Sequence, residues 1–254
     1  MKVTFLGTGT SSGVPMIGCA CAVCNSNNQK DNRLRCSVLV EFDDGFTIVI
    51  DTGPDFRYQM LRAKVKRLNA ILFTHNHKDH TAGLDDIRAF NYLQKSAIDV
   101  YATKEVQASL IKSYDYVFAE HKYPGIPNVK LIEFENKAFE IAGKTIQPIL
   151  VKHYKLPVFG FRIDDFTYIT DANYIAPEEL DKVKGSKVFV LNALRLEKHI
   201  SHFTLHEAIE VAQSAEVEQS YFTHISHQLG LHNEIDSSLP SDINLAFDGL
   251  TITI

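Results

Sequence analysis

Four side chains that can bind a metal ion stand close together in His75-Asn76-His77-Lys78-Asp79-His80. Imidazole nitrogens combined with a carboxylate suit Zn²⁺, Fe²⁺ or Mn²⁺. A tight loop does not easily point all four at one ion, whereas His75 and His77 can face one way and Asp79 and His80 a neighbouring way. The pattern therefore favours two adjacent metal ions over the alternative, a solvated polar turn.

A second cluster of metal-competent residues is Cys19-Ala20-Cys21-Ala22-Val23-Cys24. Thiolates at this spacing can surround one Zn²⁺, which takes four tetrahedral ligands, so a fourth ligand must come from elsewhere in the chain. Three cysteines this close together do not pair neatly into disulfides. One alternative is a set of reduced thiols without metal. Another is a nucleic-acid zinc finger, which needs paired ligand sets and basic helices that the sequence lacks.

The histidine-rich stretches follow predicted strands. The apolar run Ala70–Thr74 predicts a strand before His75, and the pattern beyond the motif predicts a helix over Thr81–Gln94. The capping-box pattern Thr204-x-x-Glu207 predicts a helix over Thr204–Ser214. Strands alternating with helices indicate sheets covered by helices, with sites in the loops at strand ends. Further strands that carry site residues at their ends are predicted over Thr145–Val151, Phe166–Thr170 and Gln219–Thr223.

Length and charge narrow the class of protein. The chain has 254 residues, 26 Lys and Arg against 31 Asp and Glu, and a net charge of −5. This acidic balance argues against a nucleic-acid partner, which a basic stripe would serve. No apolar run is long enough for a membrane span, and free thiols without a signal peptide indicate the cytoplasm.

Without a long linker, residues 1–254 are expected to form one domain. The cations Arg57, Arg62, Lys64, Lys66 and Arg67 are expected on a solvated helix face.

The motif Thr74-His75-x-His77-x-Asp79-His80-x-x-Gly83 resembles the metal motif of the metallo-β-lactamase superfamily. Gly7-Thr8-Gly9-Thr10 is similar to the first loop of that family, and Asp51-Thr52-Gly53 to the Asp that supports the metal loop. The resemblance implies an α/β fold, the four-layer αβ/βα sandwich, with metals at one edge of two sheets. It also implies further ligands at strand ends. One ion would be held by His75, His77 and His153, the other by Asp79, His80 and His224, with Asp171 between them.

The cysteine cluster follows Gly13-Val14-Pro15, and Thr223-His-Ile-Ser-His-Gln228 lies near the other end of the chain. Together they resemble the cyclic phosphodiesterase branch of the carbon–phosphorus lyase pathway, the phosphoribosyl cyclic phosphate phosphodiesterase type. The resemblance implies two catalytic divalent metals (Zn, Mn or Fe) plus one structural Zn in a small insert at about 13–36. We expect His227 to complete the zinc site, because it stands three residues after His224 and one turn of chain could serve both sites. The zinc ligands are then Cys19, Cys21, Cys24 and His227.

His202 matches in position a histidine that is proposed in relatives to contact phosphate or to protonate the leaving oxygen. A histidine near the metals can do this at neutral pH. His199 and His206 flank it, and both stay open as alternatives for the acid.

These residues predict a dinuclear metal-dependent phosphodiesterase that hydrolyses a small, for example cyclic, phosphate diester. A metal-bridging hydroxide held by Asp79 and Asp171 would attack, and His202 would assist the leaving group. The alternatives are a tRNA 3′-processing-type endonuclease, which usually carries a basic arm, a thioester or β-lactam hydrolase of the same fold, and a metal-bound sensor protein. The expected partner is the small phosphodiester substrate, with no membrane, and a homodimer stays open because relatives are often dimers.

Overall fold

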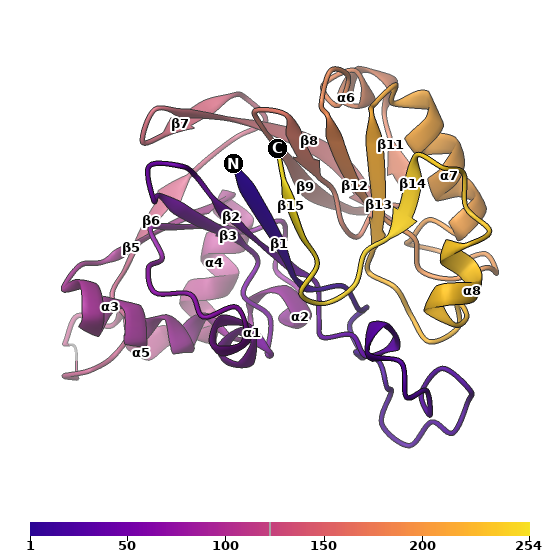
Figure 1. Cartoon of the computed structure of the whole chain (residues 1–254). Helices are drawn as coiled ribbons and strands as arrows, with labels where there is room; N and C mark the ends of the chain where they lie inside the picture. The colour runs from indigo at the N-terminus through magenta and orange to yellow at the C-terminus, as the bar shows by residue number, and fades with distance from the viewer. Residues whose placement is uncertain (122) are drawn as a thin grey trace.

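The computed structural model describes residues 1–121 and 123–254, and Figure 1 shows their arrangement. The strands are β1 (Lys2–Gly7), β2 (Ser37–Glu41), β3 (Thr47–Ile50), β4 (Ala70–Leu72), β5 (Ile98–Ala102), β6 (Val129–Glu133), β7 (Phe139–Ile141), β8 (Lys144–His153), β9 (Leu156–Ile163), β10 (Phe166–Tyr168), β11 (Tyr174–Ile175), β12 (Val188–Asn192), β13 (Gln219–Thr223), β14 (Ile243–Leu245) and β15 (Thr251–Thr253). The α-helices are α1 (Phe56–Arg62), α2 (Lys78–Thr81), α3 (Arg88–Gln94), α4 (Lys104–Ser113), α5 (Asp115–Phe118), α6 (Pro177–Leu180), α7 (Leu205–Ser214) and α8 (His232–Asp236), with 3₁₀ helices η1 (Gln29–Asp31) and η2 (Leu84–Ile87).

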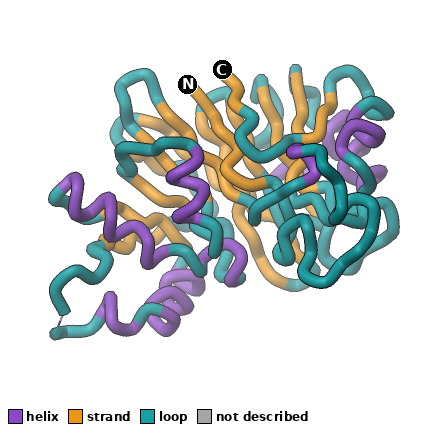
Figure 2. The backbone as a smooth tube through the Cα atoms, turned by 60° about the horizontal axis from the view of Figure 1, so that its bottom comes forward, coloured by secondary structure: helices purple, strands orange, loops and turns teal. Residues whose placement is uncertain are grey.

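The strands form two mixed sheets. The first has the order β15-β1-β2-β3-β4-β5-β6, antiparallel up to β3 and parallel from there. The second has the order β11-β8-β9-β10-β12-β13-β14, antiparallel around β8 and β9 and parallel from β10 onward. Strand β7 pairs with β8 beside this path. The helices α1 to α5 lie on one side and α6 to α8 on the other, with the strands between them (Figures 1 and 2).

The alternation of buried residues along each strand explains the layers, because successive side chains point to opposite faces of a sheet. Val38 and Val40 lie in the core between the two sheets, whereas Leu39 packs in the outer core with α1, α3 and α4. In the second sheet Val190 faces the inner core, and Phe189 packs outward with residues of α7. Both faces of these strands are buried, which accounts for their nearly continuous apolar runs. The expected four-layer αβ/βα sandwich is therefore confirmed.

The predicted helix over Thr81–Gln94 is wrong as one continuous element. The chain instead forms α2, η2 and α3 in succession, and it turns at Gly83. A Cβ at Gly83 would lie 2.1 Å from the Gly53 carbonyl oxygen, so this turn depends on the close approach of two backbones. The predicted helix over Thr204–Ser214 is confirmed, with Thr204 as the cap of α7 and both capping-box hydrogen bonds to Glu207 present.

The segment that contains the cysteines projects from the sheets below α8 in Figure 1. Its base is held by the isolated bridge between Val14 and Arg33. A second bridge joins Gly9 to Ile225, which places the first loop of the chain beside the loop after β13. Among the described residues, no helix is both long and apolar enough to cross a membrane.

Candidate metal centre

The histidine motif is divided between a loop and a short helix. His75 follows β4 closely, and α2 begins directly after His77, so Asp79 and His80 lie on the first turn of that helix. The Thr52 backbone N–H donates to the His80 carbonyl at 2.8 Å, and the Gly83 N–H donates to the Thr52 carbonyl at 2.8 Å. The motif is thereby fixed against the Asp51-Thr52-Gly53 loop.

Asp51 braces the motif through side-chain contacts. Its Oδ2 accepts hydrogen bonds from His80 Nδ1 at 2.7 Å and from the Thr74 hydroxyl at 2.8 Å. Its Oδ1 accepts one from the Thr74 backbone N–H at 2.9 Å. With Nδ1 as the donor, the other nitrogen of His80, Nε2, is presented to the site in a fixed orientation. Burial raises the pKa of Asp51, and the positive field of His80 opposes that rise.

One group of donor atoms consists of those of Asp79, His80, Asp171 and His224, which all lie within 4.8 Å of one another. His80 Nε2 lies 3.2 Å from Asp79 Oδ2 and 3.1 Å from Asp171 Oδ2. His224 Nδ1 lies 3.1 Å from the same Asp171 oxygen. The structure thus brings together the four residues expected around the second ion, from α2 and from the loops after β10 and β13.

The residues expected around the first ion lie beside this group. The His77 and His153 ring centroids are 5.2 Å apart, and those of His75 and His153 are 5.9 Å apart. Donor atoms of His153, Asp171 and His202 form a further group within 4.8 Å. His75 Nε2 is buried with no hydrogen-bond partner among the described residues, which fits a nitrogen reserved for a ligand.

Burial and neighbouring charges set the protonation of these groups. Burial lowers the pKa of His224 to about 3 and also lowers that of His153. Burial opposes protonation of His80, but the carboxylates of Asp171, Asp51 and Asp79 raise its pKa well above the ordinary value. Asp171 is also buried, yet His224 and His80 hold its pKa well below the usual range. Metal binding at this group would therefore displace a proton from His80, because only the neutral ring is a ligand.

Backbone strain marks the same site. Asp51, Asp171 and His224 have φ angles of 64°, 53° and 56°, in the left-handed region that residues with a Cβ rarely adopt. Each such position costs on the order of 1–3 kcal/mol and persists only where the surroundings fix it. Asp171 and His224 are in contact, and Asp51 reaches the same group through His80, so all three strained positions hold side chains at the centre.

The three histidines open for the acid role are placed differently. His202 Nε2 lies 3.1 Å from Asp171 Oδ1, and His202 Nδ1 lies 3.1 Å from His199 Nδ1. The Ser201 N–H donates to His199 Nδ1 at 3.3 Å, so His199 stands behind His202 rather than at the carboxylate. His206 is exposed on α7 and lies 3.5 Å from Glu210, away from the group around Asp171.

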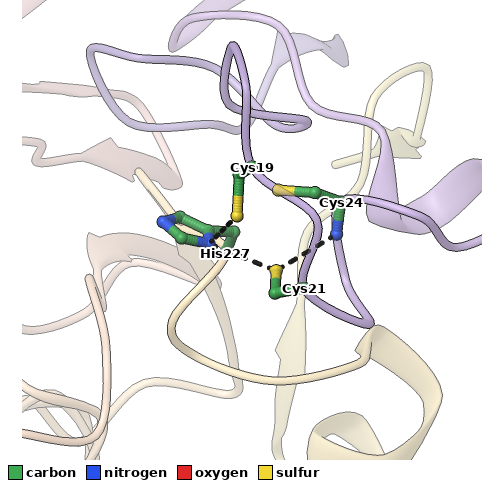
Figure 3. A group of neighbouring side chains, drawn as sticks. All are labelled: Cys19, Cys21, Cys24 and His227. Atoms are coloured by element: carbon green, nitrogen blue, oxygen red, sulfur yellow. Dashed lines mark hydrogen bonds between the residues drawn. The ribbon is translucent and has the colours of Figure 1, made fainter.

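The cysteine cluster closes around His227 (Figure 3). Its Nδ1 lies 3.5 Å from Cys19 Sγ and 3.3 Å from Cys21 Sγ, and Cys24 completes the group. A tetrahedral zinc with ordinary Zn–S and Zn–N lengths needs an N···S edge of about 3.6 Å, so the four donors fit such an ion. The Cys24 backbone N–H and the His227 ring lower the pKa of Cys21 to about 6, whereas burial raises that of Cys24 to about 11.

Sequence reasoning missed two residues that hold His224. The Thr10 hydroxyl lies 3.1 Å from His224 Nε2, on the side of the ring opposite Asp171. Cys36 Sγ accepts the His224 backbone N–H at 3.1 Å. The Gly7-Thr8-Gly9-Thr10 motif was the available signal for Thr10, whereas nothing in the sequence around Cys36 distinguishes it from a buried apolar residue.

The comparisons with known proteins identify the family of the chain. The family model described as "Beta-lactamase superfamily domain" matches residues 47–225. A solved diphosphatase from the PhnP family is 38% identical, covers 100% of this chain and 97% of its own, and superposes with a TM-score of 0.93. Zn²⁺-bound PqqB from Methylobacterium extorquens is 19% identical, covers 100% of both chains and superposes with a TM-score of 0.83, which shows the shared fold.

The chain therefore belongs to the metallo-β-lactamase superfamily and is a metal-dependent hydrolase. Within the superfamily, the likeness to the PhnP-family diphosphatase places it near the PhnP branch.

Two curated relatives also match. An octanoyltransferase from Porphyromonas gingivalis is 40% identical over 100% of this chain and 52% of its own length, so the chain spans about half of that relative. A ribonuclease Z from Anoxybacillus flavithermus is 23% identical over 89% of this chain and 87% of its own.

Proposed function

We propose that the chain is a dinuclear-metal phosphodiesterase that hydrolyses a small phosphate diester. The observation that carries this proposal is the position of Asp171. One of its oxygens lies 3.1 Å from both His80 and His224, and the other lies 3.1 Å from His202. Donor atoms of Asp171 and of His153, a proposed ligand of the other ion, also lie within 4.8 Å of each other. A carboxylate placed between two groups of nitrogen donors can contact two neighbouring cations.

In this proposal the chain holds three metal ions. Two divalent ions (Zn²⁺, Mn²⁺ or Fe²⁺) would supply Lewis acidity to the phosphate and activate water near neutral pH. A structural zinc would hold the projecting segment, and its reduced thiols fit a reducing cytoplasm. The proposed ligands are His75, His77 and His153 for one ion, Asp79, His80 and His224 for the second, Asp171 for both, and Cys19, Cys21, Cys24 and His227 for the structural zinc.

The remaining steps belong to side chains of this protein. Asp79 would accept a hydrogen bond from the attacking water, because its carboxylate faces the space shared by His80 and Asp171. His202 would donate a proton to the leaving oxygen from Nε2, the nitrogen that faces Asp171. His199 would support His202 from the opposite side of the ring at Nδ1.

The proposed substrate class is chosen from the likeness to the PhnP branch and from the net charge of the chain. The PhnP-family diphosphatase supports chemistry at phosphorus, and a diphosphate is the second phosphate linkage to test. The ribonuclease Z relative supports the same chemistry on RNA, but a net charge of −5 disfavours a large polyanion. The chain spans about half of the octanoyltransferase relative. An acyl thioester is therefore included among the substrates to be tested.

The test is a substrate panel with two matched histidine variants. The panel contains a cyclic phosphodiester, an aryl phosphodiester, a nucleoside diphosphate, a tRNA precursor and an acyl thioester. We expect cleavage of a small diester that is lost in His80→Ala and kept in His206→Ala, which removes the same side chain from an exposed position. Elemental analysis of the wild type should give three metals per chain. Thioester hydrolysis with no action on diesters, or equal activity of both variants, would contradict the proposal.

A further inference from the structure

A large apolar groove lies outside the metal centre, between α1, α3 and the turn at Gly125 and Ile126. Its volume is about 960 Å³. Phe56 and Phe90 are buried in its floor. Leu93 and Tyr92 stand on its rim with 68% and 84% of their surface exposed, and Leu61 is 59% exposed. Exposed apolar residues gathered on one surface are a mark of an interaction site rather than of ordinary surface.

The charged residues of the groove are mainly cations. Arg57, Lys66 and Arg88 line it, against the single acid Asp86. Within the described residues, Arg57 and Lys66 have no carboxylate within ion-pair distance, whereas Arg88 lies 3.4 Å from Asp85. The cations of this region that were expected on a solvated helix face thus lie partly along an apolar groove.

The sequence shows how unusual this stretch is. Residues 56–78 contain no Asp or Glu, although the whole chain has a net charge of −5. The groove is therefore a positive surface on a negative molecule. Of the cations in this stretch, Arg57 and Lys66 line the groove. The others are Arg62, which is paired with Asp248 at 3.2 Å, Lys64, Arg67 and Lys78.

We propose that this groove docks an acidic amphipathic helix of a partner protein. A gap between two helices with an apolar floor accepts the apolar face of a third helix, whose residues at spacings of three and four enter as anchors. The free cations on the rim then select acidic residues on the flanks of that helix, because complementary charge sets specificity and the association rate. Nucleic acid fits less well, because the floor is apolar and Asp86 would repel a phosphate backbone.

The groove is independent of the proposed chemistry, since none of its lining residues belongs to the metal centre. A docked partner would contact α1, which begins shortly after Asp51, the residue that braces His80. The docking proposal concerns recognition of another protein, and its test does not depend on which substrate the metal centre hydrolyses.

The probe is a designed helical peptide of about 18 residues, or five turns, with leucines along one face and glutamates elsewhere. A matched peptide has lysine at every glutamate position. Fluorescence anisotropy with the full chain should show the acidic peptide binding more tightly by about tenfold or more. The double variant Arg57→Glu/Lys66→Glu should reverse that preference, while Lys112→Glu/Lys137→Glu, the same charge change at exposed sites elsewhere, should leave it unchanged.

Several results would overturn the proposal. These are no binding of either peptide at about 1 mM, equal binding of both, or an acidic-peptide affinity that the Arg57/Lys66 reversal leaves intact. Tighter binding of a single-stranded oligonucleotide, or self-association in sedimentation that the reversal abolishes, would assign the groove to nucleic acid or to a second copy instead. The circular dichroism spectrum and the Tm of the reversal variant should match those of the wild type, which confirms that it folds whatever the substrate of the metal centre.

Discussion

The substitution Asp51→Asn tests how the buried carboxylate behind the metal centre acts. An amide can replace one acceptor oxygen but puts an NH₂ group where Oδ2 now accepts from His80 and from the Thr74 hydroxyl. The Thr74 hydroxyl can rotate and accept from the new NH₂ group. The Nδ1–H group of His80 cannot, and it would face a second donor. The ring would have to move its proton to Nε2, the nitrogen that faces Asp171. A protonated Nε2 cannot bind a metal ion.

The size of the effect follows from the loss of a supporting hydrogen bond. Removing such a partner lowers metal affinity by about 10- to 100-fold, or about 1.4–2.8 kcal/mol. Titration of metal-free protein against a fluorescent chelator should show this loss for one of the two catalytic ions, with the zinc of the cysteine cluster unaffected. At a metal concentration that just saturates the wild type, the variant should hold two ions per chain in place of three.

A matched control is Asp164→Asn, which makes the same chemical change at an exposed turn. Asp164 has a φ of 50°, close to the 64° of Asp51, so any effect of asparagine in the left-handed region is shared. Unchanged affinity for both catalytic ions in Asp51→Asn, or an equal loss in the control, would refute the reasoning.

Three further predictions follow from the site. Cys24→Ser should lower the metal content by one ion per chain and lower the Tm, measured by elemental analysis and thermal denaturation; an unchanged metal content would argue against a four-ligand zinc. His202→Ala should lower kcat by about 10²- to 10⁴-fold at constant metal content, with His206→Ala as the unaffected control, and equal kinetics of the two would remove His202 from the mechanism. Gly53→Ala would place a Cβ 2.2 Å from the Asp79 carbonyl oxygen. Urea denaturation should therefore show a free energy of unfolding that is lower by about 1–3 kcal/mol. An unchanged free energy of unfolding would mean that the loop adjusts without cost.

The parts of the site that lie close together in the sequence were predictable from it. His75, His77, Asp79 and His80 fall within one short stretch after an apolar run, so neither their type nor their neighbourhood depends on the tertiary fold. The cysteine cluster is local in the same sense. Its fourth member, His227, was expected from its position three residues after His224, and the structure places it at the three sulfurs.

The remote members of the site could not be derived from residue patterns alone. His153, Asp171 and His224 are single polar residues near strand ends, and only the order of strands in the second sheet brings them together. Family resemblance supplied them. The contacts of His224 with Thr10 and Cys36 join residues 214 and 188 positions apart, which no local pattern encodes.

Strands β6 and β14 were not predicted from the sequence, and one helix was predicted wrongly, each for a physical reason. Strand β14 has only three residues, Ile243–Leu245, too few to show a period. Strand β6 (Val129–Glu133) lies at the end of the strand order of the first sheet. Its polar and apolar residues do not alternate strictly, so no strand pattern is visible in the sequence. The helix expected over Thr81–Gln94 is interrupted because Gly83 packs against Gly53, a contact between loops that helical periodicity does not reveal.

The central claim is that Asp171 is shared by two metal ions. The most direct measurement is a crystal structure of the metal-loaded protein with anomalous diffraction data collected at the zinc, iron and manganese absorption edges. We expect two neighbouring peaks that both contact the Asp171 carboxylate, one beside His153 and one beside His80 and His224, with a third peak among the cysteines. A single peak at the centre, or two peaks of which only one touches Asp171, would contradict it.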